Sequence, residues 1–159
     1  MNDYLLSQRM IVLDYSHDAR FGGYVISAIT TNPSAKMPYT EQYCSVPKDY
    51  NIKSGDLGSF DKKYAQNIDL IWRPMPKDEY TSEIYTVVGL VDIVKNREVV
   101  VYGKNIGEKR IDFRNFPRNI QVGHKLLLRS RKEAPDKYDV VHNITMARLK
   151  YEIDQGMYK

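Results

Sequence analysis

An alternation of apolar and polar residues between positions 84 and 144 constrains the fold of this chain more than any other feature. The apolar runs are short, rich in Val and Ile, and bounded by Gly, Pro, Asn and Asp, which is typical of β-strands that bury one face. Five such runs in succession predict a small closed β-sheet. They are residues 84–94, 99–102 and 110–116, the run that follows Gly123, and residues 138–144.

The first two runs predict a β-hairpin with its turn at Asn96-Arg97. Asparagine tolerates the positive φ that a two-residue turn needs, and this turn places Val94 opposite Val99. Gly89 stands in the middle of the first run. A glycine inside a strand often marks a bulge or a sharp bend, so we expect one there.

Positive charge is concentrated in the half of the chain that contains these runs. Residues 1–80 carry a net charge of −1 and residues 81–159 a net charge of +5. A basic bias confined to one half is typical of a surface that binds a polyanion, although a solvated surface without a partner has the same composition.

Strand alternation separates candidate binding residues from the expected core. It directs Ile111, Phe113, Leu126 and Leu128 inward and the neighbouring basic residues outward. Cations follow a phosphate backbone, and aromatic rings among them stack on unpaired bases. The candidate nucleic-acid-binding residues are Lys95, Arg97, Tyr102, Arg110, Arg114, Phe116, Lys125, Arg129 and Arg131.

The N-terminal half is expected to be extended but more irregular. Residues 9–15 and 24–29 have strand patterns, whereas Pro and Gly punctuate residues 31–66 too often for long elements. Residues 60–67, at the end of that stretch, suggest one or two turns of helix. The expected organisation is a β extension over residues 1–80, and a barrel with a C-terminal helix at 145–155 over residues 81–159, with one compact domain as the alternative.

Nothing in the sequence has the signature of an enzyme. Asp14, His17 and Asp18 cluster in one loop, but they lack a third or fourth neighbour for a metal site and are more typical of a polar turn. Cys44 is the single cysteine, so the chain has no internal disulfide, and no base lies near it in the sequence. We therefore expect no catalytic residue, metal or cofactor, and we rank a small enzyme third among the functions.

The N-terminal residues lack a signal-peptide pattern, and no apolar run approaches the length of a membrane span. The sequence therefore predicts a protein of the cytoplasm that does not contact the membrane. It leaves open whether the chain forms a homo-oligomer.

The stretch 84–144 resembles the oligonucleotide-binding OB-fold in its architecture. The resemblance lies in a long first strand with the internal Gly89, a hairpin into residues 99–102, a third strand, and a connection to the Val-Gly-His-Lys-Leu-Leu-Leu run at 122–128. It implies a five-stranded barrel that binds single strands on the face of its second and third strands. The expected fold is thus mainly β: an OB-like barrel, an N-terminal β extension and a short C-terminal helix.

The function that follows is non-catalytic binding of single-stranded DNA or RNA. The chain ends Gln-Gly-Met-Tyr-Lys without an acidic tail, which favours a phage- or plasmid-type accessory protein over a housekeeping single-strand-binding protein. The alternative is a protein–protein interaction or structural assembly module of a phage or mobile element. The two differ in salt dependence, because only phosphate binding weakens steeply with salt.

Overall fold

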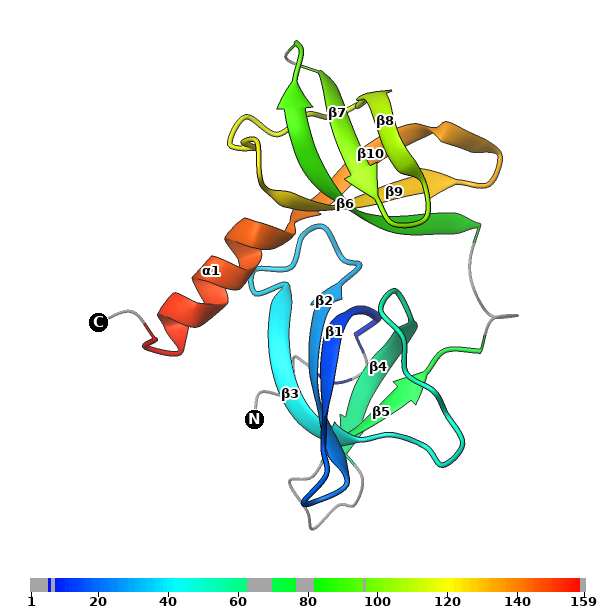
Figure 1. The fold of residues 1–159 in the computed structure, drawn as a ribbon, viewed down its shortest axis with the longest axis vertical. Coiled ribbons are helices and arrows are strands. Elements are labelled where there is room, and N and C mark those ends of the chain that lie inside the picture. The colour runs from blue at the N-terminus through cyan, green and yellow to red at the C-terminus, as the bar shows by residue number, and fades with distance from the viewer. Residues whose placement is uncertain (1–5, 7, 63–69, 77–81, 96, 158–159) are drawn as a thin grey trace. The chain divides into compact units, whose positions relative to one another are not determined.

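The computed structural model describes residues 6, 8–62, 70–76, 82–95 and 97–157. It divides into two compact units, Met1–Glu79 and Tyr80–Lys159 (Figure 1). Both units are built from β-strands, and one helix of the described residues, α1 (Ile144–Asp154), follows the last strand. The prediction of a mainly β fold with a five-stranded barrel and a short C-terminal helix is therefore confirmed.

The N-terminal unit is a closed barrel with the strand order β1-β2-β3-β5-β4. The first three strands run antiparallel to one another, and β4 pairs with β1. The barrel closes because β5 lies between β3 and β4, parallel to β3 and antiparallel to β4. This arrangement is compatible with an OB-like fold. The strands are β1 (Met10–Asp18), β2 (Gly23–Thr30), β3 (Tyr39–Ser45), β4 (Leu57–Lys62) and β5 (Leu70–Pro74).

The closed barrel thus lies in the N-terminal unit, whereas the sequence predicted it within residues 84–144. Two of its strands, β3 and β4, lie inside the stretch 31–66, for which irregular chain was expected. The first residues of the expected helix at 60–67 belong to β4, and residues 63–67 lie outside the described part of the chain. The barrel depends on the distant pairing of Cys44 with Leu70, which no local sequence pattern indicates.

The core of the N-terminal barrel is centred on two large aromatic side chains. Phe60 and Trp72 are both fully buried, and their rings meet edge to face with centroids 5.2 Å apart. The indole nitrogen of Trp72 donates a hydrogen bond to the hydroxyl of Tyr50 at 3.3 Å, so its polar atom has a partner. The core also contains Met10, Val12, Ile26, Ala28, Cys44, Ile52 and Leu70.

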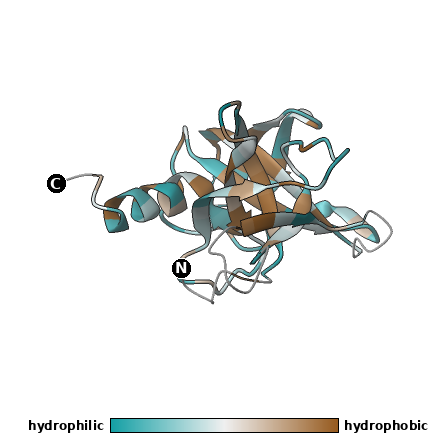
Figure 2. Cartoon of the chain, turned by 90° about the horizontal axis from the view of Figure 1, so that it is seen from below, coloured by the Kyte–Doolittle hydropathy of each residue, from teal (hydrophilic) through white to brown (hydrophobic). Residues whose placement is uncertain are grey.

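The C-terminal unit contains five strands that overlap the five runs predicted from the alternation, but β8 ends at Asp112 where the prediction continued to residue 116, and β10 begins at Ala134 where the prediction began at residue 138. They form a sheet in the order β10-β9-β6-β7-β8. In Figure 2, hydrophobic residues gather on strands in the middle of the view, and the turns at the edge are mostly hydrophilic. The strands are β6 (Glu83–Ile93), β7 (Glu98–Gly103), β8 (Gly107–Asp112), β9 (Lys125–Arg131) and β10 (Ala134–Asn143).

The two units share one strand connectivity. In the C-terminal unit, β6, β7 and β8 run antiparallel, and β9 pairs with β6, as β4 pairs with β1. A parallel bridge between Phe113 and Tyr138 then joins the chain after β8 to β10, as β3 joins β5. The amide of Arg114 donates to the carbonyl of Tyr138 at 3.2 Å and supports this join. The sequence shows no repeat at a fixed period, so the repetition is one of topology.

The hairpin of β6 and β7 differs in register from the prediction. Ile93, not Val94, lies opposite Val99, and the amide of Val94 donates to the carbonyl of Glu98 at 2.9 Å, so the strands pair one residue away from the register of the predicted two-residue turn. A bulge between Leu90 and Asp92 then shifts the register by one more residue, so that Leu90 lies opposite Val101. The bulge therefore lies close to Gly89, where a bulge or bend was expected, but not at the glycine itself.

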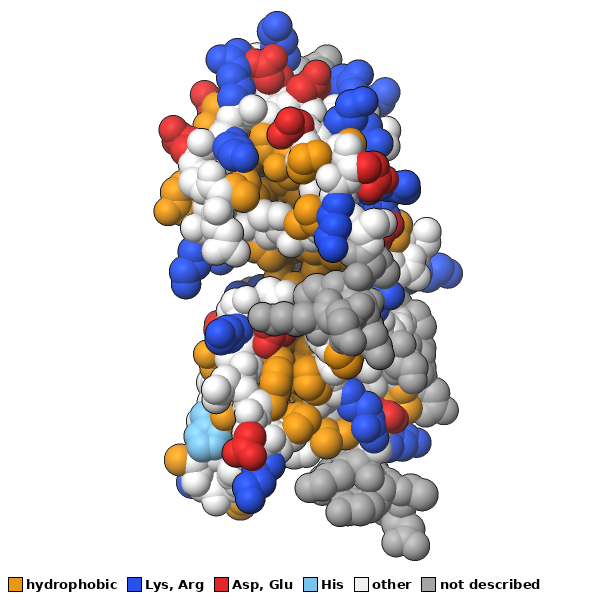
Figure 3. All heavy atoms as spheres, turned by 90° about the vertical axis from the view of Figure 1, so that its right-hand side faces the viewer, with side chains coloured by type: hydrophobic (Ala, Val, Ile, Leu, Met, Phe, Trp, Pro, Cys, Tyr) orange, Lys and Arg blue, Asp and Glu red, His pale blue; other side chains and the backbone are white. Residues whose placement is uncertain are grey.

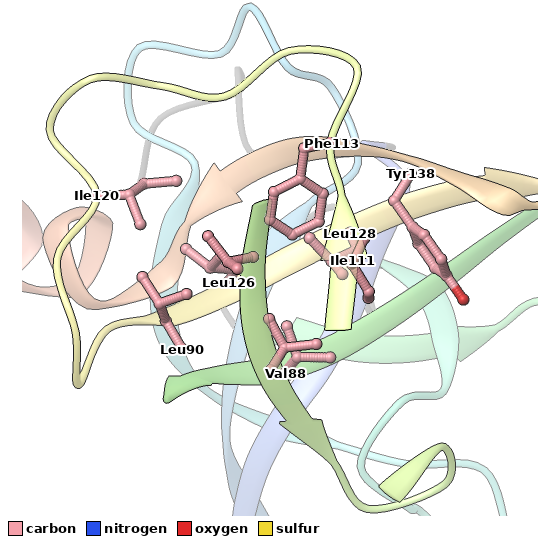
Figure 4. Close-up of a cluster of buried hydrophobic side chains, with 10 residues drawn as sticks. Val88, Leu90, Ile111, Phe113, Ile120, Leu126, Leu128 and Tyr138 are labelled. Carbon is pink, nitrogen blue, oxygen red and sulfur yellow. The ribbon is translucent and has the colours of Figure 1, made fainter. Parts of the chain in front are cut away.

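The core of the C-terminal unit matches the inward face predicted from alternation. Ile111, Phe113, Leu126 and Leu128 are all buried, and Figure 4 shows their side chains converging with those of Val88, Leu90, Ile120 and Tyr138. At the other end of the unit, the side chain of Asn143 caps α1 by accepting a hydrogen bond from the amide of Met146. The hydroxyl of Thr145, the next residue but one after Asn143, accepts a hydrogen bond from the amide of Lys125 at 2.8 Å.

Candidate nucleic-acid interface

The outward face of β7 and β8, which the OB-fold resemblance implies as the binding face, is acidic. Glu98 lies opposite Asp112, and Tyr102 lies opposite Glu108. Arg110 is the basic residue among them and forms an ion pair with Glu98. Tyr102 is well exposed, but a face with three carboxylates and one arginine has a net negative charge, which repels a phosphate backbone.

Basic residues instead gather around a groove in the same unit. The groove, of about 630 Å³, lies between the tip of the β6–β7 hairpin and the segment that follows β8. Three arginines and three apolar residues line it, and no carboxylate is among its described lining residues. We call it the arginine groove; it is lined by Ile93, Arg97, Arg114, Asn115, Phe116, Arg118 and Ile120.

Hydrogen bonds to the backbone hold the two sides of the arginine groove together. The side chain of Arg97 donates to the carbonyls of Phe113 and Arg114, at 2.9 and 3.2 Å. The amide of Phe113 donates in turn to the carbonyl of Arg97 at 2.9 Å. Arg97 is also 3.8 Å from the carboxylate of Asp112, an exposed contact that contributes little to stability. Arg97 is therefore fixed in place while its charge still faces the groove.

A single carboxylate partly neutralises two of the predicted arginines. Arg114 forms an ion pair with Asp139 at 2.7 Å, and Arg129 approaches the same carboxylate oxygen at 3.7 Å. Strand alternation predicted that Arg114 and Arg129 point outward, and the structure brings them together through Asp139. Two cations share one anion, so this cluster keeps a net positive charge.

Arg118 has the least neutralised charge in the arginine groove. It is exposed, and it forms no ion pair with any residue in the described part of the chain. Arg118 was not among the residues predicted from the sequence, because it follows Pro117 and lies outside the alternating strands. The spacing of Arg114-Asn-Phe-Pro-Arg118, in which two arginines flank an aromatic residue, could have indicated it.

Phe116 supplies an aromatic surface beside these arginines. Its ring is half-buried and lies nearly parallel to that of the buried Phe113, with centroids 5.9 Å apart and an interplanar angle of 18°. Phe113 thus supports one face of Phe116. The stacking geometry gives the groove a fixed ring next to three cations.

The structure does not bring the remaining predicted residues into the groove. Lys95 is exposed at the hairpin tip, and Lys125 is exposed at the start of β9. Arg131 lies at the end of β9, 3.8 Å from Glu133. Figure 3 shows acidic and basic side chains interspersed on one side of the molecule.

The residues considered for catalysis have structural roles. Asp14 and His17 lie within strand β1 and not in the polar loop that the sequence predicted, and the carboxylate of Asp14 accepts a hydrogen bond from the amide of Tyr15 at 2.8 Å. Asp18 ends the strand, and its carboxylate accepts from the amide of Arg20 at 3.0 Å, as in the predicted turn. Within the described residues, no three His, Cys, Asp or Glu side chains lie together where they could hold a metal ion. The described part of the chain likewise contains no helix that is long and apolar enough to span a membrane.

Cys44 is buried in the core of the N-terminal barrel, and this burial raises the pKa of its thiol to about 12. A thiol with this pKa is protonated at neutral pH, and only the thiolate is an effective nucleophile.

We therefore expect Cys44 of the folded protein to resist alkylation at pH 8, where roughly one thiol in 10⁴ is ionised. In denaturant the same thiol should react at the rate of a free cysteine. Mass-spectrometric counting of iodoacetamide adducts over time measures both rates. Rapid modification of the folded protein would contradict the buried position of Cys44.

Comparison with protein-family models and with curated protein sequences finds no match to this chain. The geometry of the site therefore carries the functional argument.

Proposed function

We propose that the C-terminal unit binds single-stranded nucleic acid in the arginine groove, without catalysing a reaction on it. The observation that carries this proposal is the convergence of Arg97, Arg114 and Arg118 around the ring of Phe116 in one groove. Guanidinium groups pair with phosphate oxygens in a bidentate manner, and an aromatic ring stacks on any base. A groove with both features fits a chain of phosphates with unpaired bases.

The size and the charge of the groove support this class of ligand. Its volume of about 630 Å³ lies within the range of sites that hold a small organic group such as a nucleotide. The surrounding cluster contains four arginines, Arg129 included, and two carboxylates, Asp112 and Asp139. A polyanion gains from this imbalance, whereas a neutral ligand gains nothing from it.

The interface differs from the one that the OB-fold resemblance implied. Binding lies at the hairpin tip and the segment after β8, and the acidic face of β7 and β8 is left out. Arg110 and Tyr102 therefore drop out of the proposed site, and Arg118 enters it.

Titration of a fluorescently labelled single strand, DNA or RNA, at several salt concentrations tests the proposal by anisotropy. Arg118→Ala should weaken binding to all base sequences and reduce the slope of log affinity against log salt by about 0.7, the value for one phosphate of a single strand. Phe116→Ala should weaken binding without changing the slope, since stacking releases no counterions. Asp139→Asn should act in the opposite sense to Arg118→Ala, because it frees the charge of Arg114 and Arg129.

Arg110→Ala is the matched control, because it removes an arginine of the same unit that lies outside the groove and is paired with Glu98. It should leave the salt slope unchanged. The proposal fails if wild-type protein binds no single strand at low salt, or if Arg118→Ala binds with the wild-type affinity and slope.

One observation favours a second candidate function, a protein–protein interaction module. Three apolar side chains of α1 are exposed, with Met146 and Leu149 at 40% and Ile153 at 53% of their full accessibility. Exposed apolar rows of this kind mark interaction surfaces. Binding through α1 would be insensitive to salt and unaffected by Arg118→Ala, so the same titration series separates the two functions.

A further inference from the structure

The N-terminal barrel contains a hollow of about 460 Å³ at the place that corresponds to the arginine groove. Both lie between the turn of the first hairpin in their unit and the end of the third strand. In the N-terminal unit these are the β1–β2 turn and the end of β3; in the C-terminal unit they are the β6–β7 tip and the chain after β8. We call it the aromatic hollow; it is lined by Phe21, Gly22, Gly23, Tyr43, Cys44, Ser45 and Leu70.

The two sites differ in their chemistry. None of the described residues that line the aromatic hollow is charged, whereas three arginines line the groove. The nearest cation among the neighbouring residues of the turn, Arg20, lies over the ring of Phe21 and is 3.6 Å from Asp18. Among these described lining residues no side chain carries a charge that would pair with a phosphate, so the surface that they offer suits the uncharged part of a ligand.

Two exposed aromatic rings provide that binding surface. The ring of Phe21 is 75% exposed and that of Tyr43 is 48% exposed. Tyr43 lies directly over Gly23 of the neighbouring strand, because a Cβ atom at Gly23 would come within 2.4 Å of the ring. The glycine thus lets the tyrosine lie against the sheet with one face toward solvent. Large aromatic residues are usually buried, so two exposed rings beside one hollow are a feature that a structural role does not explain.

We infer that the aromatic hollow binds an unpaired base of a single-stranded nucleic acid, by stacking on Tyr43 with Phe21 as a second ring. The inference rests on the proposed function for the identity of the polymer. It adds a second contact site in the other unit, and it assigns the two sites different parts of the ligand. The arginine groove binds phosphates and a base, and the aromatic hollow binds a base alone.

Photo-crosslinking tests the inference directly. A single-stranded oligonucleotide that carries 5-iodouracil is irradiated with the full-length protein, and the crosslinked peptides are identified by mass spectrometry. Crosslinks are expected at Tyr43 or Phe21, in addition to the Phe116 peptide. Tyr15 serves as the internal control, because it is a similarly exposed tyrosine of the same barrel that does not line the hollow.

Affinity measurements provide the second readout. Tyr43→Ala should weaken binding by about 5- to 150-fold, the range for loss of one stacked base, and should keep the wild-type salt slope. Tyr43→Phe should bind as wild type, because stacking needs the ring and not the hydroxyl. Tyr15→Ala should also bind as wild type. Circular dichroism and the emission of Trp72 establish that each variant is folded.

The possible failures are distinguishable. If wild-type protein binds and Arg118→Ala reduces the salt slope, but Tyr43→Ala binds as wild type and no crosslink reaches Tyr43 or Phe21, then this inference alone is overturned. Crosslinks in the aromatic hollow together with an unchanged slope for Arg118→Ala would overturn the arginine groove and keep the hollow. Failure of wild-type protein to bind any single strand would overturn both.

Discussion

Replacement of Phe113 by alanine is expected to lower the free energy of unfolding of the C-terminal unit by about 3–5 kcal/mol. Phe113 is fully buried at the centre of the core that Figure 4 shows, so its removal leaves a large cavity. Its backbone also forms the parallel bridge to Tyr138. Denaturant unfolding followed by circular dichroism measures the change.

Phe116→Ala is the control for this prediction. Phe116 is half-buried and packs on Phe113 from the groove, so its removal should cost clearly less stability than removal of Phe113. Phe113→Ala should also weaken nucleic-acid binding, because Phe116 loses the ring that supports it. A loss of less than about 1 kcal/mol in Phe113→Ala would mean that the core is not centred where the structure places it.

Gly58→Ala is expected to destabilise the N-terminal barrel by about 1–3 kcal/mol or more, the range for overpacking a core. A Cβ atom at Gly58 would lie 2.5 Å from the carbonyl oxygen of Arg73 and 2.5 Å from the indole ring of Trp72. The first neighbour is backbone in the adjacent strand β5, which cannot rotate away as a side chain does. Thermal unfolding measures the loss, and Trp72, the single tryptophan, reports by its emission whether the ring has moved.

The matched control is Gly89→Ala in β6. A Cβ atom there meets no atom closer than the carbonyl oxygen of Tyr102 at 3.9 Å, an ordinary contact. This variant should therefore keep nearly the wild-type unfolding temperature. Equal losses in Gly58→Ala and Gly89→Ala would show that the close approach at Gly58 is not a constraint.

The strands of the C-terminal unit could be predicted because each carries its own alternation. Ile111 and Phe113 point inward simply because every second residue of a strand does. The register of the first hairpin could not be predicted in the same way. The pairing of Ile93 with Val99 is set at the turn, whose length the sequence did not determine. One additional residue between Leu90 and Asp92 then changes the partner of Val101, and a bulge has no fixed sequence signature.

The N-terminal barrel could not be predicted because its closure depends on distant partners. Cys44 pairs in parallel with Leu70, and the connection between them contains a further strand. The repeated connectivity was hidden for a related reason. A strand order is defined by which residues pair, and two chains of different residues can share it without any similarity that a periodicity search detects.

The candidate site was predicted in part. Arg97, Arg114 and Phe116 do meet in one groove, because they lie at the tip of a hairpin and at the end of the strand beside it. Arg110 lies outside this groove, because alternation gives the outward direction of a side chain but not the charge of the residues around it, which here include Glu98 and Asp112. Arg118 was missed because a segment without periodicity gives no direction at all.

The join between Phe113 and Tyr138 offers a way to detect binding in the arginine groove from amide hydrogen exchange, without a label on the protein. It is a single bridge backed by the hydrogen bond from the amide of Arg114, whereas β6 and β9 meet over seven paired positions. An amide in so short a join is expected to exchange its proton with solvent sooner than amides in the long ladders. The same amide begins the segment that lines the groove, so an occupied groove should slow its exchange. Residue-resolved deuterium uptake at the Arg114 amide would then report the fraction of protein whose arginine groove is occupied by ligand.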